Sequence, residues 1–193
     1  MVERLKVFDE HYRYVRDETR DTVHKKGLWH ETFHCWLVDG TNVLIQKRSA
    51  TKKDFPGLYD ITAAGHLMAN EEIMDGIREV EEELGIEVDP FKIKRMGVVR
   101  DTITLPGFID NEFSNVFFYK SNFSLTDFSL QQEEVESIHA VSIEDLQSLF
   151  KREVEQIILS NSSEITLSDF VPHETEYFLA ISEYLDLAKS GGM

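Results

Sequence analysis

Three glutamates in the segment GHLMANEEIMDGIREVEEELGI, residues 65–86, have the spacing of a metal site. Glu79, Glu82 and Glu83 are three and four residues apart, so a helix would present their carboxylates on one face. Carboxylates this close repel each other, and a divalent cation converts that repulsion into coordination. Mg²⁺ is commonly held by a few carboxylates together with the phosphates of a substrate. The spacing therefore predicts a metal-dependent enzyme.

An acidic helix face is also found on helices that do no chemistry. The opposite face of this segment shows whether the helix packs on a core. Apolar residues recur there at helical spacing, which is typical of an amphipathic helix that packs on a core. They are Ile73, Ile77, Val80 and Leu84. We therefore predict a packed helix from about Glu71 to Leu84, ended by a left-handed cap at Gly85.

The residues around the glutamates extend the pattern. In order, the chain carries Gly65, Arg78-Glu79, Glu82-Glu83 and Gly85. This arrangement resembles the Nudix box: Gly, five residues, Glu, seven residues, Arg-Glu, an apolar residue, any residue, Glu-Glu, any residue, Gly and an apolar residue. Glu71 falls on the early glutamate, but six residues separate it from Arg78 where the pattern has seven. The register of Glu71 and Glu72 is therefore open, whereas residues 78–86 match without a gap.

The resemblance implies a fold and an activity. The fold is a Nudix-type α/β/α sandwich with a mixed, largely antiparallel sheet, here with extra C-terminal helices. The activity is metal-dependent hydrolysis of a diphosphate linked to another moiety, with Mg²⁺ or Mn²⁺ held by Glu79, Glu82 and Glu83. Arg78 would orient a box glutamate through a bidentate pair. The candidates for the general base are Glu79, Glu112, Glu133 and Glu134.

A basic cluster stands out in this acidic chain, in the segment QKRSATKKDF. Its cations would bind the diphosphate. For Lys52 and Lys53, the alternative is that they lie at an exposed strand end and turn. The predicted substrate-binding residues are Lys47, Arg48, Lys52, Lys53 and Gly65. The aromatic side chains of Trp29, Phe55 and Tyr59 either line the pocket by stacking or pack around the Pro-Gly turn.

A second set of residues is similar in order and spacing to the isopentenyl-diphosphate isomerases, which share the Nudix fold. The similar stretches are VHKKGLWHETFHCWL, QKRSATKKDFPGLYDITAAGH and DNEFSNVFF. In those enzymes three histidines and two glutamates bind a metal, and the matching positions here are His24, His30, His66, Asp110 and Glu112. One acid is thus Asp instead of Glu. The resemblance implies a second metal site, and such mixed ligands do not select among Mn²⁺, Zn²⁺ and Mg²⁺.

The isomerase interpretation lacks its thiol. That family uses a Cys two or three residues before the His of the Gly-His pair, and here Ala64 and Ala63 occupy those positions. Cys35 lies in the apolar run FHCWLV and is expected to be a buried structural thiol. The chain therefore looks like the isomerase-like branch of Nudix hydrolases. A residual isomerase and a non-catalytic Nudix-fold binding domain are the alternatives.

The remaining sequence predicts the elements that position these residues. Hairpin strands are expected at 4–9 and 12–17, core strands at 31–40 and 42–50, a second antiparallel pair at 91–104 and 112–120, and amphipathic helices at 143–159, capped by Ser142, and 174–190. We expect a Nudix domain over residues 1–150, with an N-terminal hairpin extension at 1–25. Residues 151–193 would form a helical extension packed on the same domain or, alternatively, a homodimer contact.

Composition narrows the function classes. The chain has 193 residues, of which 41% are hydrophobic and 29% are charged, as expected for one globular domain. It lacks an apolar run long enough to cross a bilayer and begins without a signal-peptide pattern, so no membrane partner is expected. A single cysteine suits a reducing compartment, and we expect a cytoplasmic protein. The net charge of −16 argues against a nucleic-acid polymer and leaves a small anionic substrate.

Overall fold

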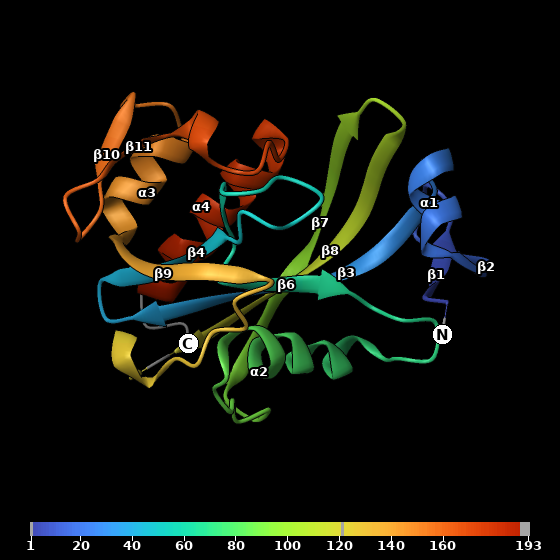
Figure 1. The fold of residues 1–193 in the computed structure, drawn as a ribbon, viewed down its shortest axis with the longest axis horizontal. Helices are drawn as coiled ribbons and strands as arrows, with labels where there is room; N and C mark the ends of the chain where they lie inside the picture. The colour runs from blue at the N-terminus through green and yellow to red at the C-terminus, as the bar shows by residue number, and fades with distance from the viewer. Residues whose placement is uncertain (1, 121, 190–193) are drawn as a thin grey trace.

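The computed structural model describes residues 2–120 and 122–189, as strands on a central sheet with helices on both sides (Figure 1). The elements in chain order are β1 (Arg4–Phe8), β2 (Tyr14–Thr19), α1 (Arg20–Lys26), β3 (Trp29–Asp39), β4 (Asn42–Arg48), β5 (Tyr59–Asp60), β6 (Ala63–His66), the 3₁₀ helix η1 (Ile73–Ile77), α2 (Arg78–Leu84), β7 (Ile93–Leu105), β8 (Phe108–Lys120), the 3₁₀ helix η2 (Leu125–Asp127), β9 (Val135–Ser142), α3 (Ile143–Phe150), β10 (Gln156–Ile158), β11 (Glu164–Thr166), the 3₁₀ helix η3 (Leu167–Asp169) and α4 (Thr175–Lys189).

Strand β3 is the centre of the sheet. One edge pairs in parallel with β8, so that His30 lies opposite Glu112. Its other edge pairs antiparallel with β1, β6 and the end of β4, and Thr32 lies opposite His66. The remaining strand pairs among the described residues are antiparallel. The β7–β8 hairpin extends away from the rest of the sheet toward α1 (Figure 1).

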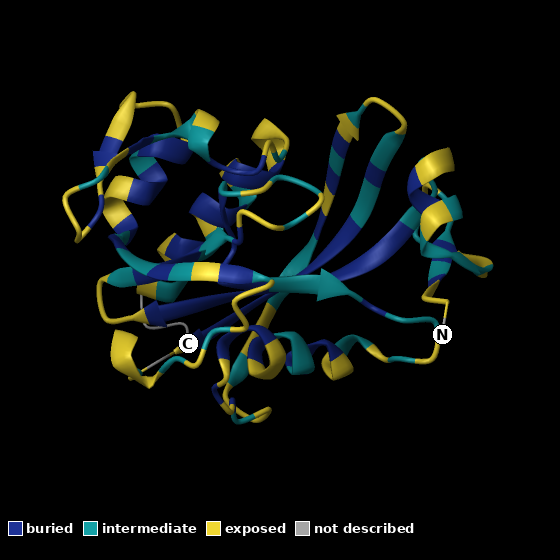
Figure 2. Ribbon diagram, in the orientation of Figure 1, coloured by how far each residue is buried: buried dark blue, intermediate teal, exposed yellow. Residues whose placement is uncertain are grey.

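The alternation of side chains along β3 builds two apolar layers. Phe33, Cys35 and Leu37 pack in one buried cluster with α2, whereas Trp36 and Val38 pack in the other with α3 and α4. Figure 2 shows β3 buried along most of its length. Helices on both faces of a mixed sheet confirm the predicted α/β fold class.

The box helix differs from its prediction at the N-terminal end. The α-helix begins only at Arg78, and Ile73–Ile77 form the 3₁₀ helix η1. A 3₁₀ helix rises about 2.0 Å per residue instead of 1.5 Å, so the same number of residues spans a longer distance. With these five residues in η1, Arg78 still reaches Glu71. The left-handed cap at Gly85 is confirmed.

The C-terminal segment is only partly helical, in contrast to the prediction. Helix α3 begins at the Ser142 cap as expected but ends at Phe150 rather than at residue 159. Arg152 has a positive φ of 59°, which breaks the helix, and the alternating burial of 156–158 suits the hairpin β10–β11. Helix α4 matches the second predicted helix, whose last residue, 190, lies outside the described residues, as do residues 1 and 191–193 of the predicted extensions.

Other differences concern the bounds of two strands and several elements that were not predicted. The second hairpin strand is shifted from 12–17 to 14–19, and β8 begins at Phe108 rather than at residue 112. Helix α1 was not predicted, although Thr19 caps its start and Gly27 ends it in the left-handed conformation. Strands β5, β6 and β9 were not predicted either. No helix among the described residues is long and apolar enough to span a bilayer.

Candidate active site

A cavity of about 330 Å³ lies over the sheet, where α2, β3, β6 and β8 meet the segment before α4. Acidic side chains predominate in its lining. Those of the box helix, Glu79, Glu82 and Glu83, are joined there by Asp110 and Glu112 from β8. The structure therefore brings the two predicted acidic groups to one cavity.

The box carboxylates differ in their environments. Glu83 is buried, and burial together with the charge of Glu79 raises the pKa of its carboxyl to about 8. Burial also raises the pKa of Glu79, against the lowering effect of the Arg78 guanidinium. The side chain of Glu82 is 57% exposed. Two carboxylates are thus held in a low-dielectric site that favours a cation beside them.

Arg78 fastens the box helix to the loop before it. Its Nε and one terminal nitrogen donate to the two carboxylate oxygens of Glu71, over 2.6 and 3.1 Å, and the guanidinium also donates to the carbonyl of His66 over 3.0 Å. It lies 2.7 Å from Glu79 and 3.3 Å from Glu82. The shortened loop thus still brings Glu71 to Arg78, while Glu72 lies outside this pair and caps η1.

Gly65 allows a close approach of β6 to the helix. A Cβ atom at this position would lie 2.2 Å from the carboxyl carbon of Glu79, which is far inside van der Waals contact. An alanine here would therefore displace the Glu79 carboxylate from its place beside the strand backbone.

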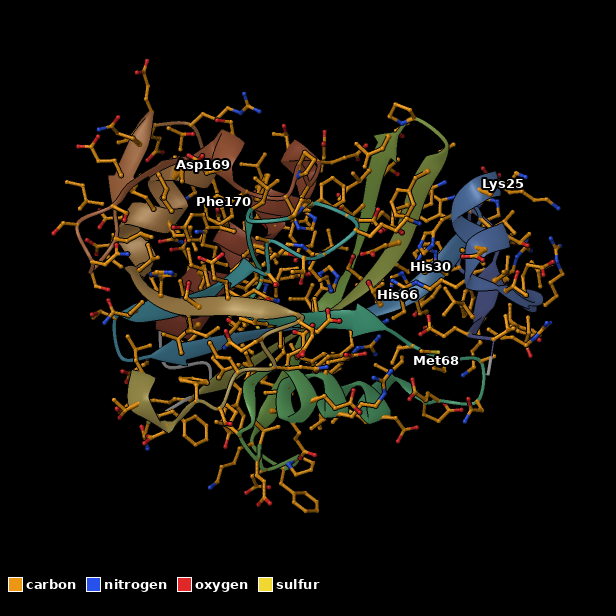
Figure 3. The ribbon with its side chains drawn as sticks, viewed as in Figure 1. Lys25, His30, His66, Met68, Asp169 and Phe170 are labelled. Carbon is orange, nitrogen blue, oxygen red and sulfur yellow. The ribbon has the colours of Figure 1, made fainter. Side chains whose placement is uncertain are left out.

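Four of the five residues predicted for the second site converge. His24, His30, His66 and Asp110 each offer one ligand atom within 4.8 Å of all the others. Figure 3 shows His30 and His66 beside each other, and their rings are stacked with centroids 5.1 Å apart. They come from α1, β3, β6 and β8, so the site forms only in the folded chain.

The atoms of this cluster have the environment of metal ligands. His30 Nδ1 donates to the carbonyl of Leu28 over 3.1 Å, which leaves Nε2 as the nitrogen that faces Asp110. His30 Nε2 and Asp110 Oδ1 are buried and 3.2 Å apart, but neither atom makes a hydrogen bond of good geometry with the described residues. Burial lowers the pKa of His66 well below its ordinary value, so its imidazole keeps a lone pair for coordination. These donors fit a divalent cation.

Glu112 lies outside this cluster, although the prediction included it. It lines the same cavity, but its Oε2 accepts hydrogen bonds from Thr32 Oγ1, over 3.0 Å, and Ser114 Oγ, over 3.2 Å. His34 Nε2 is 3.1 Å from the same oxygen. The carboxylate is therefore held by the strands on which it sits rather than by the three histidines.

The predicted basic residues are divided by the fold. Lys52 reaches the cavity and pairs with Glu134, whereas Lys53 lines only an outer basin next to it. Lys47 pairs with Glu136 over 3.0 Å and lies outside both hollows.

Arg48 lies at the cavity but also supports the loop around it. It donates to the carbonyls of Asp54 and Phe55 and pairs with Asp60 over 3.0 Å, so much of its donor capacity holds residues 54–60 in place.

The predicted aromatic residues are also divided. Phe55 lines the cavity, Tyr59 belongs to the core, and Trp29 lies under Arg100, 4.3 Å from the ring centroid to the guanidinium carbon. Ala64 lines the cavity at one position that matches the isomerase thiol. Cys35 is fully buried in the layer under α2, and burial raises the pKa of its thiol. The chain therefore has no thiol at the cavity.

One charged group in the wall of the cavity was not predicted from the sequence. His173 lies between Asp101, 2.6 Å from Nδ1, and Asp60, 3.2 Å from Nε2. Burial opposes its protonation, but the two carboxylates raise the pKa of His173 to about 10. On β3, the period-two series His30, Thr32, His34 was the one signal for polar residues facing the cavity.

Comparison with known proteins agrees with this geometry. The chain matches the family model described as the NUDIX domain over residues 28–160. It is 32% identical over 190 residues to an uncharacterized Nudix hydrolase of Clostridium acetobutylicum, a match that covers 90% of this chain and 92% of that protein. It is 29% identical over 153 residues to an isopentenyl-diphosphate Delta-isomerase of Cutibacterium acnes, covering 74% of this chain and 75% of that protein.

The fold also has a solved counterpart. A crystal structure of a protein from Deinococcus radiodurans superposes with a TM-score of 0.62 at 18% identity, covering 78% of this chain and 90% of that one. The family match covers more than half of the chain, and the clostridial relative spans most of it. The chain therefore belongs to the Nudix hydrolase family.

Proposed function

We propose that this protein hydrolyses a diphosphate linkage in a small-molecule substrate with the help of Mg²⁺ or Mn²⁺. The observation that carries the proposal is the pair of box carboxylates at the wall of a cavity of about 330 Å³: Glu83 is buried, and the side chain of Glu79 is only 13% exposed. Their raised pKa values reflect the cost of burying negative charge, which a divalent cation offsets. When bound, such a cation neutralises diphosphate oxygens and activates a water for in-line attack.

The residues fit two metal positions. The box carboxylates Glu79, Glu82 and Glu83 offer oxygen donors, as Mg²⁺ prefers. The cluster of His24, His30, His66 and Asp110 offers three nitrogens and one oxygen. Within it, the buried atoms His30 Nε2 and Asp110 Oδ1 face each other. We assign the cation at the box carboxylates to the reacting diphosphate. The histidine cluster would hold a further divalent cation.

The chain's own residues supply orientation and proton transfer. Arg78 fixes Glu79 and Glu82 through its ion pairs with their carboxylates. Among the base candidates we favour Glu112, because its carboxylate lines the cavity and is oriented by donors on β3 and β8. Glu134 is paired with Lys52, and Glu133 lines only the outer basin. Lys52 and Arg48 are the cations best placed to contact the diphosphate.

A substrate screen tests the proposal. Purified protein is incubated with nucleoside diphosphate sugars, dinucleotides, deoxynucleotides and prenyl diphosphates, each with Mg²⁺, with Mn²⁺ and with chelator. We expect a phosphorylated product from at least one substrate, no product in chelator, and recovery when the metal is restored. Glu83→Gln should reduce turnover by orders of magnitude because a ligand is lost while the shape persists.

Glu81→Gln is the matched control for this variant. Glu81 is on the same helix, but it is exposed and does not line the cavity. The control should keep wild-type turnover. Unchanged turnover in Glu83→Gln on a confirmed substrate would refute the metal assignment.

Isomerisation is the second candidate, favoured by the similarity to the Cutibacterium acnes isomerase and by the histidine cluster. The absence of a thiol at the cavity opposes it. Incubation with isopentenyl diphosphate separates the two functions, because a hydrolase releases a phosphorylated product and an isomerase forms dimethylallyl diphosphate. A protein inert toward every diphosphate would favour the non-catalytic binding domain.

A further inference from the structure

Tyr177 connects the C-terminal helix to the cavity, although it lies beyond the segment matched by the family model. It is in the first turn of α4 and is fully buried. Its hydroxyl is 2.8 Å from Nδ1 of His34, whose ring projects from β3. A buried phenol so close to an imidazole has a defined hydrogen bond, and its direction follows from the groups beyond it.

The direction is set by Glu112 at the far end of the chain of hydrogen bonds. Thr32 Oγ1 has a single proton and donates it to the carboxylate Oε2 of Glu112 over 3.0 Å. His34 Nε2 is 3.1 Å from both Thr32 Oγ1 and Glu112 Oε2, and both of these oxygens can only accept from it. In the neutral imidazole, Nε2 therefore carries the proton, Nδ1 accepts, and Tyr177 donates.

The ring of Tyr177 is itself firmly held. It stacks on the imidazole of His173, with centroids 4.5 Å apart and an interplanar angle of 24°. His173 in turn lies between Asp60 and Asp101. The donor end of the chain therefore has little freedom to rotate.

The three side chains that contact the Glu112 carboxylate all do so at the same oxygen. Oε2 accepts from Thr32 and Ser114 and lies beside His34, whereas Oε1 accepts no hydrogen bond from the described residues. Since Glu112 lines the cavity, the arrangement leaves Oε1 available there. Hydrogen bonds in such a chain polarise one another, so removing the first donor weakens the later ones.

We propose that Tyr177 is a positioning residue which acts through His34 and Thr32 to orient the Glu112 carboxylate for the hydrolytic reaction. This inference rests on the proposed function, in which Glu112 contacts the reacting water. It makes the C-terminal helix a part of the active site rather than a packing layer alone.

Nitrogen NMR of the histidine rings tests the hydrogen-bond chain without a substrate. In protein labelled with ¹⁵N-histidine, we expect His34 to be protonated at Nε2 and to show a hydrogen-bonded acceptor signal at Nδ1. Tyr177→Phe keeps the ring and removes the hydroxyl, so the Nδ1 signal should move toward that of a free acceptor. A His34 protonated at Nδ1, or an Nδ1 signal unchanged in Tyr177→Phe, would overturn the proposal.

Kinetics then test the role, using the diphosphate of the screen that the wild type hydrolyses fastest. We expect Tyr177→Phe to lower kcat about tenfold with KM changed less than twofold, because one hydrogen bond to an orienting group is lost. In a Glu112→Gln background the same change should have no further effect. Tyr184→Phe, the same substitution two turns along α4, is the matched control and should keep wild-type kcat. Thermal unfolding of each variant verifies that it is folded.

The outcomes separate this inference from the proposed function. An equal loss from Tyr177→Phe in both backgrounds would show a general structural effect and overturn the positioning role. Wild-type kcat in Tyr177→Phe, with the kcat of Glu112→Gln strongly reduced, would do the same and leave the hydrolase assignment intact. A wild type that hydrolyses none of the diphosphates would overturn the proposed function and this role with it.

Discussion

Replacing His173 with asparagine should make the stability of the protein less dependent on pH. The imidazole lies within 3.2 Å of both Asp60 and Asp101, and its side chain is only 7% exposed. These two carboxylates raise the pKa of His173 from 6.5 to about 10, despite burial. At about 1.4 kcal/mol per pKa unit, the charged ring contributes up to about 5 kcal/mol to folding.

The sign of the pH effect follows from the proton count. The folded pKa is above the unfolded one, so between pH 6.5 and about 10 the folded chain binds one more proton than the unfolded chain. The contribution is complete below pH 6.5 and is lost as the pH rises through about 10. The free energy of unfolding should therefore fall by about 1.4 kcal/mol per pH unit from this group, or about 3 kcal/mol between pH 7 and 9.

Urea unfolding at pH 7, 8 and 9 measures this dependence in metal-free protein. His173→Asn should be less stable than the wild type by about 3 to 5 kcal/mol at pH 7, since Asp101 loses its charged partner. The difference should shrink toward pH 9. His139→Asn is the control, because burial lowers the pKa of His139 and its titration lies below this range. Parallel wild-type and His173→Asn curves from pH 7 to 9 would refute the account of a clamped imidazolium.

Three further predictions concern the cavity. Gly65→Ala should lower kcat at least tenfold and weaken the Mg²⁺ binding measured by calorimetry, because the new Cβ would displace Glu79. A retained kcat would show that the close approach of β6 to the helix is not required. His30→Gln should bind one Mn²⁺ fewer per chain than the wild type, as measured by calorimetry, whereas His139→Gln should bind the wild-type number. Equal numbers in both variants would show that the histidine cluster serves packing only. The wild type should not interconvert isopentenyl and dimethylallyl diphosphates with any divalent metal, as followed by chromatography, because Ala63 and Ala64 occupy the two positions that match the isomerase thiol. Enzyme-like isomerisation would mean that another acid replaces that thiol.

The sequence determined those features that depend on spacing within one element. Helical geometry alone places Glu79, Glu82 and Glu83 on one face, and the same spacing predicts the apolar stripe that packs under the sheet. Asp110 and Glu112 are two residues apart and therefore share a face of β8, although the predicted strand began only at residue 112. The Nudix family and the convergence of the three histidines with Asp110 were also predicted from the sequence, since the family pattern carries information about distant contacts.

Tertiary structure decided everything that depends on how separate elements meet. Local pattern could not show that Lys52 reaches the cavity while Lys47 pairs with Glu136 outside it, because the difference arises from the path of the loop after β4. The end of α3 at Phe150 depends on a positive φ at Arg152, a residue that has good helical propensity. The contacts of His173 with Asp60 and Asp101 join residues 113 and 72 positions apart, respectively. Only the packing of α4 on the sheet brings them together, because the free energy that fixes such contacts comes from burial shared across the whole core rather than from any local preference.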